Sequence, residues 1–248
     1  MSRTALITGA GAADGIGFAC ARALASLGHR IALVSTTDRI HQRAADLRAS
    51  GAQAVGHIPD LRDSSQVQRL FTDLGTIDIL INNAGMGTIR EPARPQVLAE
   101  MPESCWLQAI DLSLHTAFRV TRAFLPGMLE RRWGRIVNIA SVTGPFVSSP
   151  GEAAYSAAKA GMVGMPHALA LEVASAGVTV NAVAPGWIRT GASTPDELAA
   201  AKHTPTGRAG TPDEVAAAAV FLASESASYV NGAVLVVDGG NILQERKG

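Results

Sequence analysis

The sequence predicts an α/β fold in which helices cover both faces of a parallel β-sheet. Short runs rich in β-forming residues alternate with longer helical segments along the chain, as expected for strands joined by crossover helices. Most of these runs are continuously apolar, which burial of both sheet faces requires. A glycine-rich loop links the first run to the first helical segment, and this is a third sign of a strand-loop-helix unit.

Seven strands are expected, and their residues are 4–8, 31–35, 54–58, 79–82, 135–139, 178–183 and 234–237. Signals at the helix ends support this order. The first helix, at residues 18–27, is followed by Gly28, and the next helical segment is followed by Gly51. Thr211 and Pro212 provide an N-cap and a first-turn proline before the helix at 215–223. No linker divides the series, so we expect one domain over residues 1–248.

Composition narrows the class of protein. The 248 residues are 47% hydrophobic and 17% charged, which suffices for a buried core. Lysine plus arginine balances aspartate plus glutamate at 21 each, so neither a nucleic acid nor a membrane is an expected partner. With no secretory pattern after Met1, we expect a cytoplasmic protein. Cys20, Cys105 and the scattered histidines lack metal-ligand spacing. The two cysteines are expected to be reduced packing residues, and no metal is expected.

The loop after the first strand has the composition of a phosphate-binding turn. It reads Thr8-Gly9-Ala10-Gly11-Ala12-Ala13-Asp14-Gly15-Ile16-Gly17. Glycines allow the backbone to approach a pyrophosphate closely, and the first amides of the following helix meet its charge. We therefore expect a dinucleotide to contact Gly9, Gly11, Asp14, Gly15 and Ile16. A glycine-rich turn that binds nothing would give the same pattern, so the loop alone does not settle the matter.

Three further motifs follow the loop. They are Asn82-Asn83-Ala84-Gly85, Tyr155-Ser156-Ala157-Ala158-Lys159 and Pro185-Gly186-Trp187-Ile188. With the glycine-rich loop, they make the chain resemble the classical short-chain dehydrogenase/reductase family over essentially its whole length, and within it the β-ketoacyl carrier-protein reductase-like branch. The resemblance implies a Rossmann-type doubly wound sheet of about seven strands in the order 3-2-1-4-5-6-7. It also implies a nicotinamide cofactor at the carboxyl ends of the strands, and a homotetramer.

The resemblance further implies which residues contact the cofactor. Beyond the glycine-rich loop these are Asp60, Leu61, Asn82, Ala84, Gly85, Tyr155, Lys159, Pro185, Gly186, Ile188 and Thr190. By its residue type, Asp60 could accept a hydrogen bond from the adenine amino group. An ordinary turn aspartate explains it equally well.

The end of the second strand bears on the choice between NADP and NAD. An acidic residue there would bind the ribose diol of NAD and repel a phosphate, but this chain has Ser35 and Thr36, with Arg39 just beyond. These residues could accept a 2′-phosphate, which favours NADP. Asp38 nearby, and Asp14 in the glycine-rich loop, point the other way and keep NAD open.

The candidate catalytic residues are Ser141, Tyr155, Lys159 and Ser113. Tyr155 and Lys159 lie one helical turn apart on one face. The ammonium and an oxidised nicotinamide would lower the phenol pKa from about 10, so that Tyr155 acts as general acid and base. By resemblance, Ser141 hydrogen-bonds the substrate oxygen and Lys159 also binds the nicotinamide ribose. An ordinary helix-surface pair is the alternative for Tyr155 and Lys159, and Ser148 competes with Ser141.

Three departures from the family pattern limit what it implies. Residues 10–14 make the glycine-rich loop longer than usual, so its phosphate contacts could differ. Ser113 stands where an asparagine usually anchors a proton-relay water, whereas Asp111 is out of register for that role and is expected on the helix surface. The interval from Ser141 to Tyr155 is longer by one residue, which predicts a longer substrate loop through residues 145–151.

The expected substrate is a small-molecule alcohol or carbonyl compound. The short segment at 188–207 should close over it, but its alanine-rich composition names no ligand. An apolar wall could be formed by Met86, Val142, Phe146, Val147 and Trp187, which could equally pack in the core or in an oligomer. A simple ketone, a sugar derivative, a steroid and a β-ketoacyl group therefore all stay open.

The function that these patterns favour is reversible oxidoreduction of a secondary alcohol and a ketone. The alternative is a non-catalytic NAD(P)-binding sensor or scaffold on the same fold. An epimerase or dehydratase would need a larger substrate domain than this chain has room for.

Overall fold

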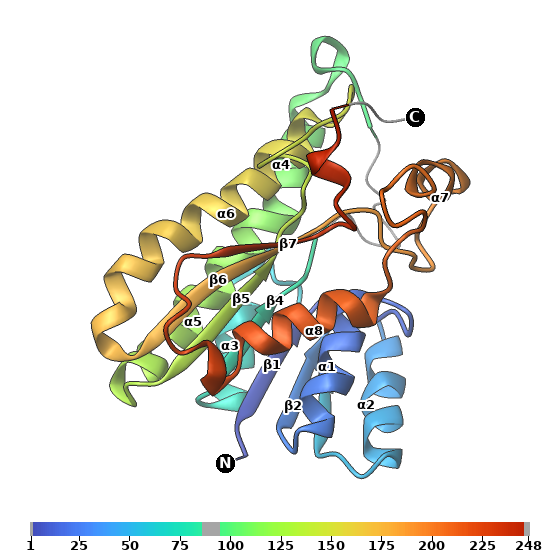
Figure 1. Cartoon of the computed structure of the whole chain (residues 1–248). Helices are drawn as coiled ribbons and strands as arrows, with labels where there is room; N and C mark the ends of the chain where they lie inside the picture. The colour runs from blue at the N-terminus through green and yellow to red at the C-terminus, as the bar shows by residue number, and fades with distance from the viewer. Residues whose placement is uncertain (1, 86–94, 246–248) are drawn as a thin grey trace.

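A computed structural model describes residues 2–85 and 95–245 (Figure 1). Its strands form one parallel sheet in the order β3-β2-β1-β4-β5-β6-β7, which confirms the expected topology. The strands are β1 (Thr4–Thr8), β2 (Arg30–Val34), β3 (Ala54–His57), β4 (Ile79–Asn82), β5 (Gly134–Ile139), β6 (Val178–Pro185) and β7 (Val234–Val237). The largest difference from the expected strand bounds is at β6, which continues two residues past Val183 because Ala184 and Pro185 pair with β7.

Helices lie on both faces of the sheet. They are α1 (Ile16–Ser26), α2 (Arg39–Ala49), α3 (Ser64–Leu74), α4 (Glu103–Ile110), α5 (Thr116–Glu130), α6 (Ala153–Val173), α7 (Pro195–Ala201) and α8 (Pro212–Leu222). Figure 1 shows α1, α2 and α8 on one face and α3, α5 and α6 on the other. A π-helical turn, η2 (Asp111–His115), joins α4 to α5.

Two hydrophobic clusters explain why the strand sequences are continuously apolar. Successive side chains of a strand point to opposite faces. In β1, Ile7 therefore belongs to the cluster under α1 and α8, whereas Leu6 belongs to the cluster under α3 and α5. Both side chains are fully buried.

Capping boxes begin the two helices near the carboxyl edge of the sheet. Thr211 and Glu214 cap α8, which begins at Pro212, three residues before the expected helix. Thr194 and Glu197 form the same motif at the start of α7. Helix α7 is not among the elements expected within the short substrate loop at 188–207, although the Thr-Pro-Asp-Glu signal precedes it as well.

The two cysteines differ in environment. Cys20 is fully buried in α1, and burial raises the pKa of its thiol to about 12, as fits a packing residue. Cys105 in α4 is exposed, so the expectation that it packs in the core is wrong. Within residues 2–85 and 95–245, no cluster of side chains could hold a metal ion. No helix in these ranges is long and apolar enough to cross a bilayer.

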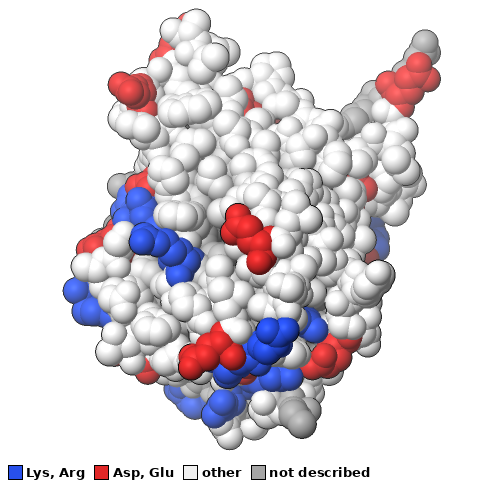
Figure 2. All heavy atoms as spheres, turned by 90° about the vertical axis from the view of Figure 1, so that its left-hand side faces the viewer, with Lys and Arg blue, Asp and Glu red and all other residues white. Residues whose placement is uncertain are grey.

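One face of the molecule is poor in charge. Figure 2 views the side that carries α5 and α6, and its charged side chains are concentrated toward the lower part. Apolar side chains are exposed on the helices of this sheet layer, including Leu107 of α4, Phe118 of α5 and Leu171 of α6.

Candidate active site

The glycine-rich loop packs tightly against the end of β4. A Cβ added at Gly9 would lie 2.9 Å from the Ala84 backbone nitrogen, and one at Gly17 would lie 2.6 Å from Asn83 Nδ2. Asn83 Nδ2 donates hydrogen bonds to the carbonyls of Thr8 and Gly9 at 3.1 and 3.0 Å. The glycines of this loop and the asparagine motif therefore form one structural unit.

The N-terminus of α1 is open to an anion. Its N-cap is Gly15, which has no side chain to accept from the first backbone N–H groups. These donors and the helix dipole suit a pyrophosphate. Asp14 is exposed, and its carboxylate lies against Gly191, where an added Cβ would be 2.6 Å from Oδ2. The extended loop thus reaches the segment that follows β6.

The end of β2 forms a cationic corner beside Gly11. A Cβ added at Gly11 would lie 2.9 Å from Ser35 Oγ and 3.9 Å from an Arg39 guanidinium nitrogen. The Arg39 Nε donates weakly to Thr37 at 3.4 Å, and no ion pair to Arg39 is found among the described residues. Thr36 is exposed at the same corner.

Asp60 is already engaged by a neighbouring arginine. Its carboxylate accepts from Arg62 Nε at 3.0 Å and from Arg62 Nη2 at 2.9 Å. The side-chain hydrogen bond with Arg62 lowers the pKa of Asp60. Leu61 beside it is buried. An adenine amino group would therefore share Asp60 with Arg62.

Asn82 faces the interior of the protein. Its Nδ2 donates to Thr121 Oγ1 at 2.9 Å and to Asn138 Oδ1 at 3.0 Å, and its side chain is buried. Its Oδ1 has no partner among the described residues. The side chain thus ties β4 to β5 and α5, and any cofactor contact would come from the Asn82 backbone.

Three of the candidate catalytic residues meet at the end of β5 and the start of α6. The Ser141 side chain lies close enough to Tyr155 to lower the pKa of its hydroxyl, and its Oγ accepts the Thr143 N–H at 3.0 Å. The Lys159 Nζ is buried, donates to the Ile139 carbonyl at 2.9 Å and lies 5.8 Å from the Tyr155 ring centroid. The strand end and the helical turn thus converge as the spacing predicts.

Ser113 and Lys159 both lie next to Gly85. A Cβ added at Gly85 would be 2.9 Å from Ser113 Oγ and 3.5 Å from Lys159 Nζ, so the two polar groups face the same small space beside its backbone. Ser113 is buried within the π-helical turn η2, a distortion that often marks functional sites. Asp111 faces elsewhere and pairs with Arg119 at 2.8 Å, as its expected place on the helix surface implies.

The electrostatics of Tyr155 differ from the expectation. Burial raises the pKa of Tyr155 to about 12, against the opposing hydrogen bond from Ser141. Burial also lowers the pKa of Lys159 to about 8. The free protein therefore holds Tyr155 as a neutral phenol, and Lys159 alone does not produce a phenolate.

Two carboxylates that are not among the expected site residues, Glu152 and Glu197, influence the pKa of Tyr155. Glu152 and Glu197 both raise the pKa of Tyr155 further. The spacing of Glu152, three residues before Tyr155, places both on one side of the helix start and could have revealed it. Glu197 could not be found this way, because α7 brings it from a separate part of the chain.

The loop after β6 completes the rim of the site. A Cβ added at Gly186 would lie 2.6 Å from Asp238 Cβ, so the loops after β6 and β7 are in contact. Ile188 pairs with Gly210, and the Thr190 N–H donates to Ser193 Oγ at 3.0 Å.

The residues expected to form an apolar wall differ in how far they are buried. Val142 is buried, Phe146 is exposed, and Val147 and Trp187 are half-buried. Met86 lies outside the described residues.

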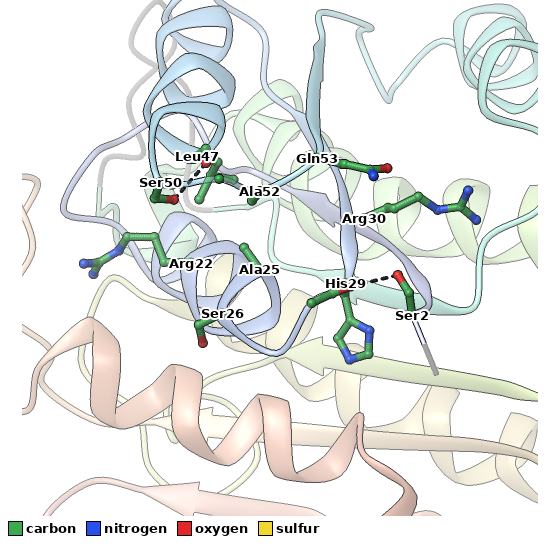
Figure 3. Close-up of a pocket in the computed structure, with 12 residues that line it drawn as sticks. Ser2, Arg22, Ala25, Ser26, His29, Arg30, Leu47, Ser50, Ala52 and Gln53 are labelled. Carbon is green, nitrogen blue, oxygen red and sulfur yellow. Dashed lines mark hydrogen bonds between the residues drawn. The ribbon is translucent and has the colours of Figure 1, made fainter.

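A separate pocket of about 530 Å³ lies at the amino-terminal edge of the sheet, near the ends of α1 and α2 (Figure 3). Its hydroxyl groups are already used. Ser2 Oγ donates to the Gly28 carbonyl at 2.8 Å, and Ser50 Oγ donates to the Leu47 carbonyl at 2.8 Å. Ligands of open α/β sheets bind at the carboxyl ends of the strands, so this pocket is not the candidate site.

Comparison with known proteins gives consistent matches. A family model described as "Enoyl-(Acyl carrier protein) reductase" matches residues 9–241. The 3-oxoacyl-[acyl-carrier-protein] reductase FabG of Escherichia coli is 38% identical, over 96% of each chain. A solved 3-oxoacyl-[acyl-carrier protein] reductase from Brucella melitensis with bound NAD has a TM-score of 0.89 and 33% identity, covering 98% of this chain and 92% of its own. A structure from Beutenbergia cavernae, described as an NAD(P)-dependent gluconate 5-dehydrogenase with NADP at low occupancy, has a TM-score of 0.89 and 36% identity, covering 98% and 97%.

Proposed function

The chain belongs to the short-chain dehydrogenase/reductase family of NAD(P)-dependent oxidoreductases, and we propose that it interconverts a ketone and a secondary alcohol with Tyr155 as general acid and base. The observation that carries this proposal is the position of the Tyr155 ring 5.8 Å from the buried ammonium of Lys159, with the Ser141 side chain close enough to act on its hydroxyl. Two hydroxyls that already meet can both bind one carbonyl oxygen, where negative charge develops during reduction.

Tyr155 is suited to donate a proton. Because burial keeps it neutral, its hydroxyl can protonate the carbonyl oxygen as the carbonyl carbon accepts a hydride. A bound reduced nicotinamide would supply that hydride. Ser141 Oγ would orient the same oxygen. In the reverse direction Tyr155 must take a proton from the alcohol, and the positive charge of an oxidised nicotinamide would then favour the phenolate.

The residues around the glycine-rich loop fit a dinucleotide. A Cβ at Gly9 or Gly17 would collide with the asparagine motif that follows β4. The backbone N–H groups at the start of α1 have no side-chain acceptor and are available to a phosphate. We infer that the pyrophosphate lies at Gly15 and Ile16, and that the nicotinamide half contacts the rim formed by Pro185, Gly186, Ile188 and Thr190. The backbones of Ala84 and Gly85 would lie between these two regions.

NADP is the cofactor that the β2 corner favours. Arg39 reaches toward Gly11 and Ser35 without an acidic partner among the described residues, so its charge is available for a 2′-phosphate. Ser35 and Thr36 add hydroxyls at the same corner.

Lys159 and Ser113 would form a proton relay behind Tyr155. The Lys159 Nζ donates to the Ile139 carbonyl at 2.9 Å and weakly to Met162 Sδ at 3.9 Å. Its third N–H would serve the nicotinamide ribose, and the weak contact with sulfur could be exchanged for a water. Ser113 Oγ, which like Lys159 Nζ lies next to Gly85, would share that water.

A homo-oligomer is proposed as well. The exposed apolar side chains of Leu107 on α4 and Phe118 on α5 would pack against a second copy of the chain. Light scattering of the purified protein tests this: a single-chain mass at micromolar concentration would oppose it.

Turnover and cofactor binding together test the proposed function. Wild type and Tyr155→Phe are assayed with NADPH and NADH against a panel of ketones, while cofactor binding is followed by fluorescence. We expect turnover to fall by a factor of about 10² to 10⁴ in Tyr155→Phe with cofactor affinity retained. Unchanged turnover would refute the role of Tyr155, and tight cofactor binding without wild-type turnover of any ketone would favour the sensor.

A further inference from the structure

A cavity distinct from the pocket of Figure 3 lies where β5 and β6 begin, and we call it the β5–β6 cavity. Its volume is about 530 Å³, which is enough for a small organic molecule. Cofactors of open α/β sheets bind at the opposite, carboxyl ends of the strands, so this cavity is separate from the candidate active site. The polar and aromatic side chains that line it and carry the argument below are Arg132, Trp133, Arg135, Thr179, Glu225 and Tyr229.

Thr179 brings an unpartnered hydroxyl to the wall of the β5–β6 cavity. Its side chain is buried, with the residue 5% exposed, and its Oγ1 has no hydrogen-bond partner among the described residues. A buried hydroxyl without a partner costs free energy that a ligand could recover. Thr179 pairs in register with Arg135 on the neighbouring strand, so both side chains lie on the same face of the sheet. The hydroxyl is therefore beside a guanidinium group.

Positive charge is in excess around the β5–β6 cavity. Two arginines, Arg132 and Arg135, and one glutamate, Glu225, line it. The exposed Glu225 carboxylate is already shared, because it accepts from Arg3 Nη2 at 3.2 Å and from Trp133 Nε1 at 3.0 Å. The Arg135 Nη2 lies 3.6 Å from it, which is beyond hydrogen-bond distance. One carboxylate therefore does not neutralise the guanidinium groups that surround the cavity.

Both lining arginines keep donors for a ligand. Arg135 is buried, and its Nε and Nη1 donate to backbone carbonyls, which fixes the guanidinium group and leaves Nη2 with only the loose ion pair to Glu225. Arg132 donates its Nη2 to a backbone carbonyl and has no ion pair among the described residues. A guanidinium group has five N–H donors. Together the two arginines and the Thr179 hydroxyl therefore suit an anion that accepts several hydrogen bonds.

Two aromatic rings give the β5–β6 cavity one fixed wall and one free wall. The Trp133 ring is held by the guanidinium carbons of Arg3 and Arg135, which lie 3.7 and 4.5 Å from its centroid. Tyr229 is fully exposed, and no ring or guanidinium group stacks on it in the part of the chain that the structure describes. A flat apolar group in the cavity would cover the Tyr229 ring.

We propose that the β5–β6 cavity is a binding site for a small aromatic carboxylate. The carboxylate accepts hydrogen bonds from Thr179 Oγ1, Arg132 and Arg135 Nη2, and the aromatic ring of the ligand lies against Tyr229. This ligand is neither the cofactor nor the reacting ketone, because both of those belong at the other edge of the sheet. The inference therefore does not depend on the proposed reaction.

Three small molecules test the chemistry of this site. Benzoate carries a ring and a carboxylate, benzyl alcohol keeps the ring without the charge, and acetate keeps the charge without the ring. Each is titrated calorimetrically into the protein with saturating NADP⁺, which keeps it out of the nicotinamide site. We expect benzoate to bind at one site per chain, about tenfold more tightly than either of the other two. No binding of benzoate at millimolar concentration, or equal affinity for benzyl alcohol, would overturn the inference.

Variants locate the bound benzoate. Thr179→Val keeps the shape of the side chain and removes its hydroxyl, so benzoate affinity should fall by about tenfold. Because the hydroxyl has no partner in the free protein, this variant should unfold at a temperature no lower than wild type. Arg132→Gln removes a charge and should also weaken benzoate binding by about tenfold.

Arg30→Gln is the matched control, because Arg30 lines the pocket of Figure 3. It should bind benzoate as tightly as wild type does. Benzoate affinity that stays unchanged in both Thr179→Val and Arg132→Gln, or that falls in Arg30→Gln, would overturn the inference.

Discussion

The adenosine half and the catalytic half of the site are specified in different ways. Around β1 and β2 the loop requires glycine, because a Cβ at Gly9, Gly11 or Gly17 would meet a neighbouring atom at 2.9 Å or less. Around β5 and α6 it depends on polar side chains that are buried, with Lys159 at 3% and Ser141 at 9% exposure. Backbone shape thus prepares one half for the cofactor, and desolvated side chains prepare the other for chemistry.

The largest expected effect falls in the catalytic half. Ser141→Ala removes the hydroxyl that lowers the pKa of Tyr155 and would bond the substrate oxygen. We expect kcat to fall by a factor of about 10² to 10³, with the dissociation constant of NADPH unchanged. Steady-state kinetics and fluorescence titration check both values. A cofactor affinity that falls together with kcat would show that the two halves are not separable.

Gly17→Ala tests the cofactor half from the backbone side. Its new Cβ would lie 2.6 Å from Asn83 Nδ2 and 2.8 Å from the Gly9 carbonyl, so the loop must move away from the β4 motif. Such overpacking costs about 1–3 kcal/mol, and we expect NADPH affinity to fall by about 10- to 100-fold. Gly164→Ala in α6, where nothing lies within 4 Å of the new Cβ, should leave affinity unchanged. Equal NADPH affinities in Gly17→Ala and Gly164→Ala would contradict the claim that the tight packing of the glycine-rich loop shapes the cofactor site.

Arg39→Ala tests whether the charge of Arg39 contributes to cofactor binding in the same half of the site. If Arg39 binds the 2′-phosphate, its loss should weaken NADPH binding by about tenfold and leave NADH binding nearly unchanged. The ratio of the two dissociation constants, measured at fixed ionic strength, gives the answer directly. A parallel loss for both cofactors would place Arg39 elsewhere than at the phosphate.

A further prediction concerns the pH dependence of stability that Lys159 confers. Burial lowers its pKa from 10.5 to about 8, so between these pH values the unfolded chain binds the proton that the folded chain has lost. The contribution of Lys159 to the free energy of unfolding therefore rises as pH increases from about 8 to 10.5. Thermal denaturation should show wild type gaining stability relative to Lys159→Met over that range. A constant difference between the two would mean that the ammonium is not desolvated.

Sequence patterns predicted the cofactor half better than the tuning of the catalytic half. The glycine-rich loop and the asparagine motif follow from local signals, and the strand order and the place of Ser141 near Tyr155 follow from the family resemblance. The pKa of Tyr155 does not, because it depends on how deeply α6 packs and on Glu197, which arrives from α7. Likewise, the hydrogen bond from Arg62 to Asp60 depends on the side-chain rotamers, which the spacing of residues in the sequence does not determine.

The ionisation of Tyr155 tests the central claim most directly. The chain has two tyrosines, and the other, Tyr229, is fully exposed, so the Tyr229→Phe variant isolates the absorbance of Tyr155 in a spectroscopic pH titration. The account predicts that the free protein shows no tyrosinate through pH about 10, the ordinary tyrosine value, and that saturating NADP⁺ shifts the titration to lower pH. Tyrosinate forming near neutral pH without cofactor would contradict the claim that burial keeps Tyr155 ready to donate its proton.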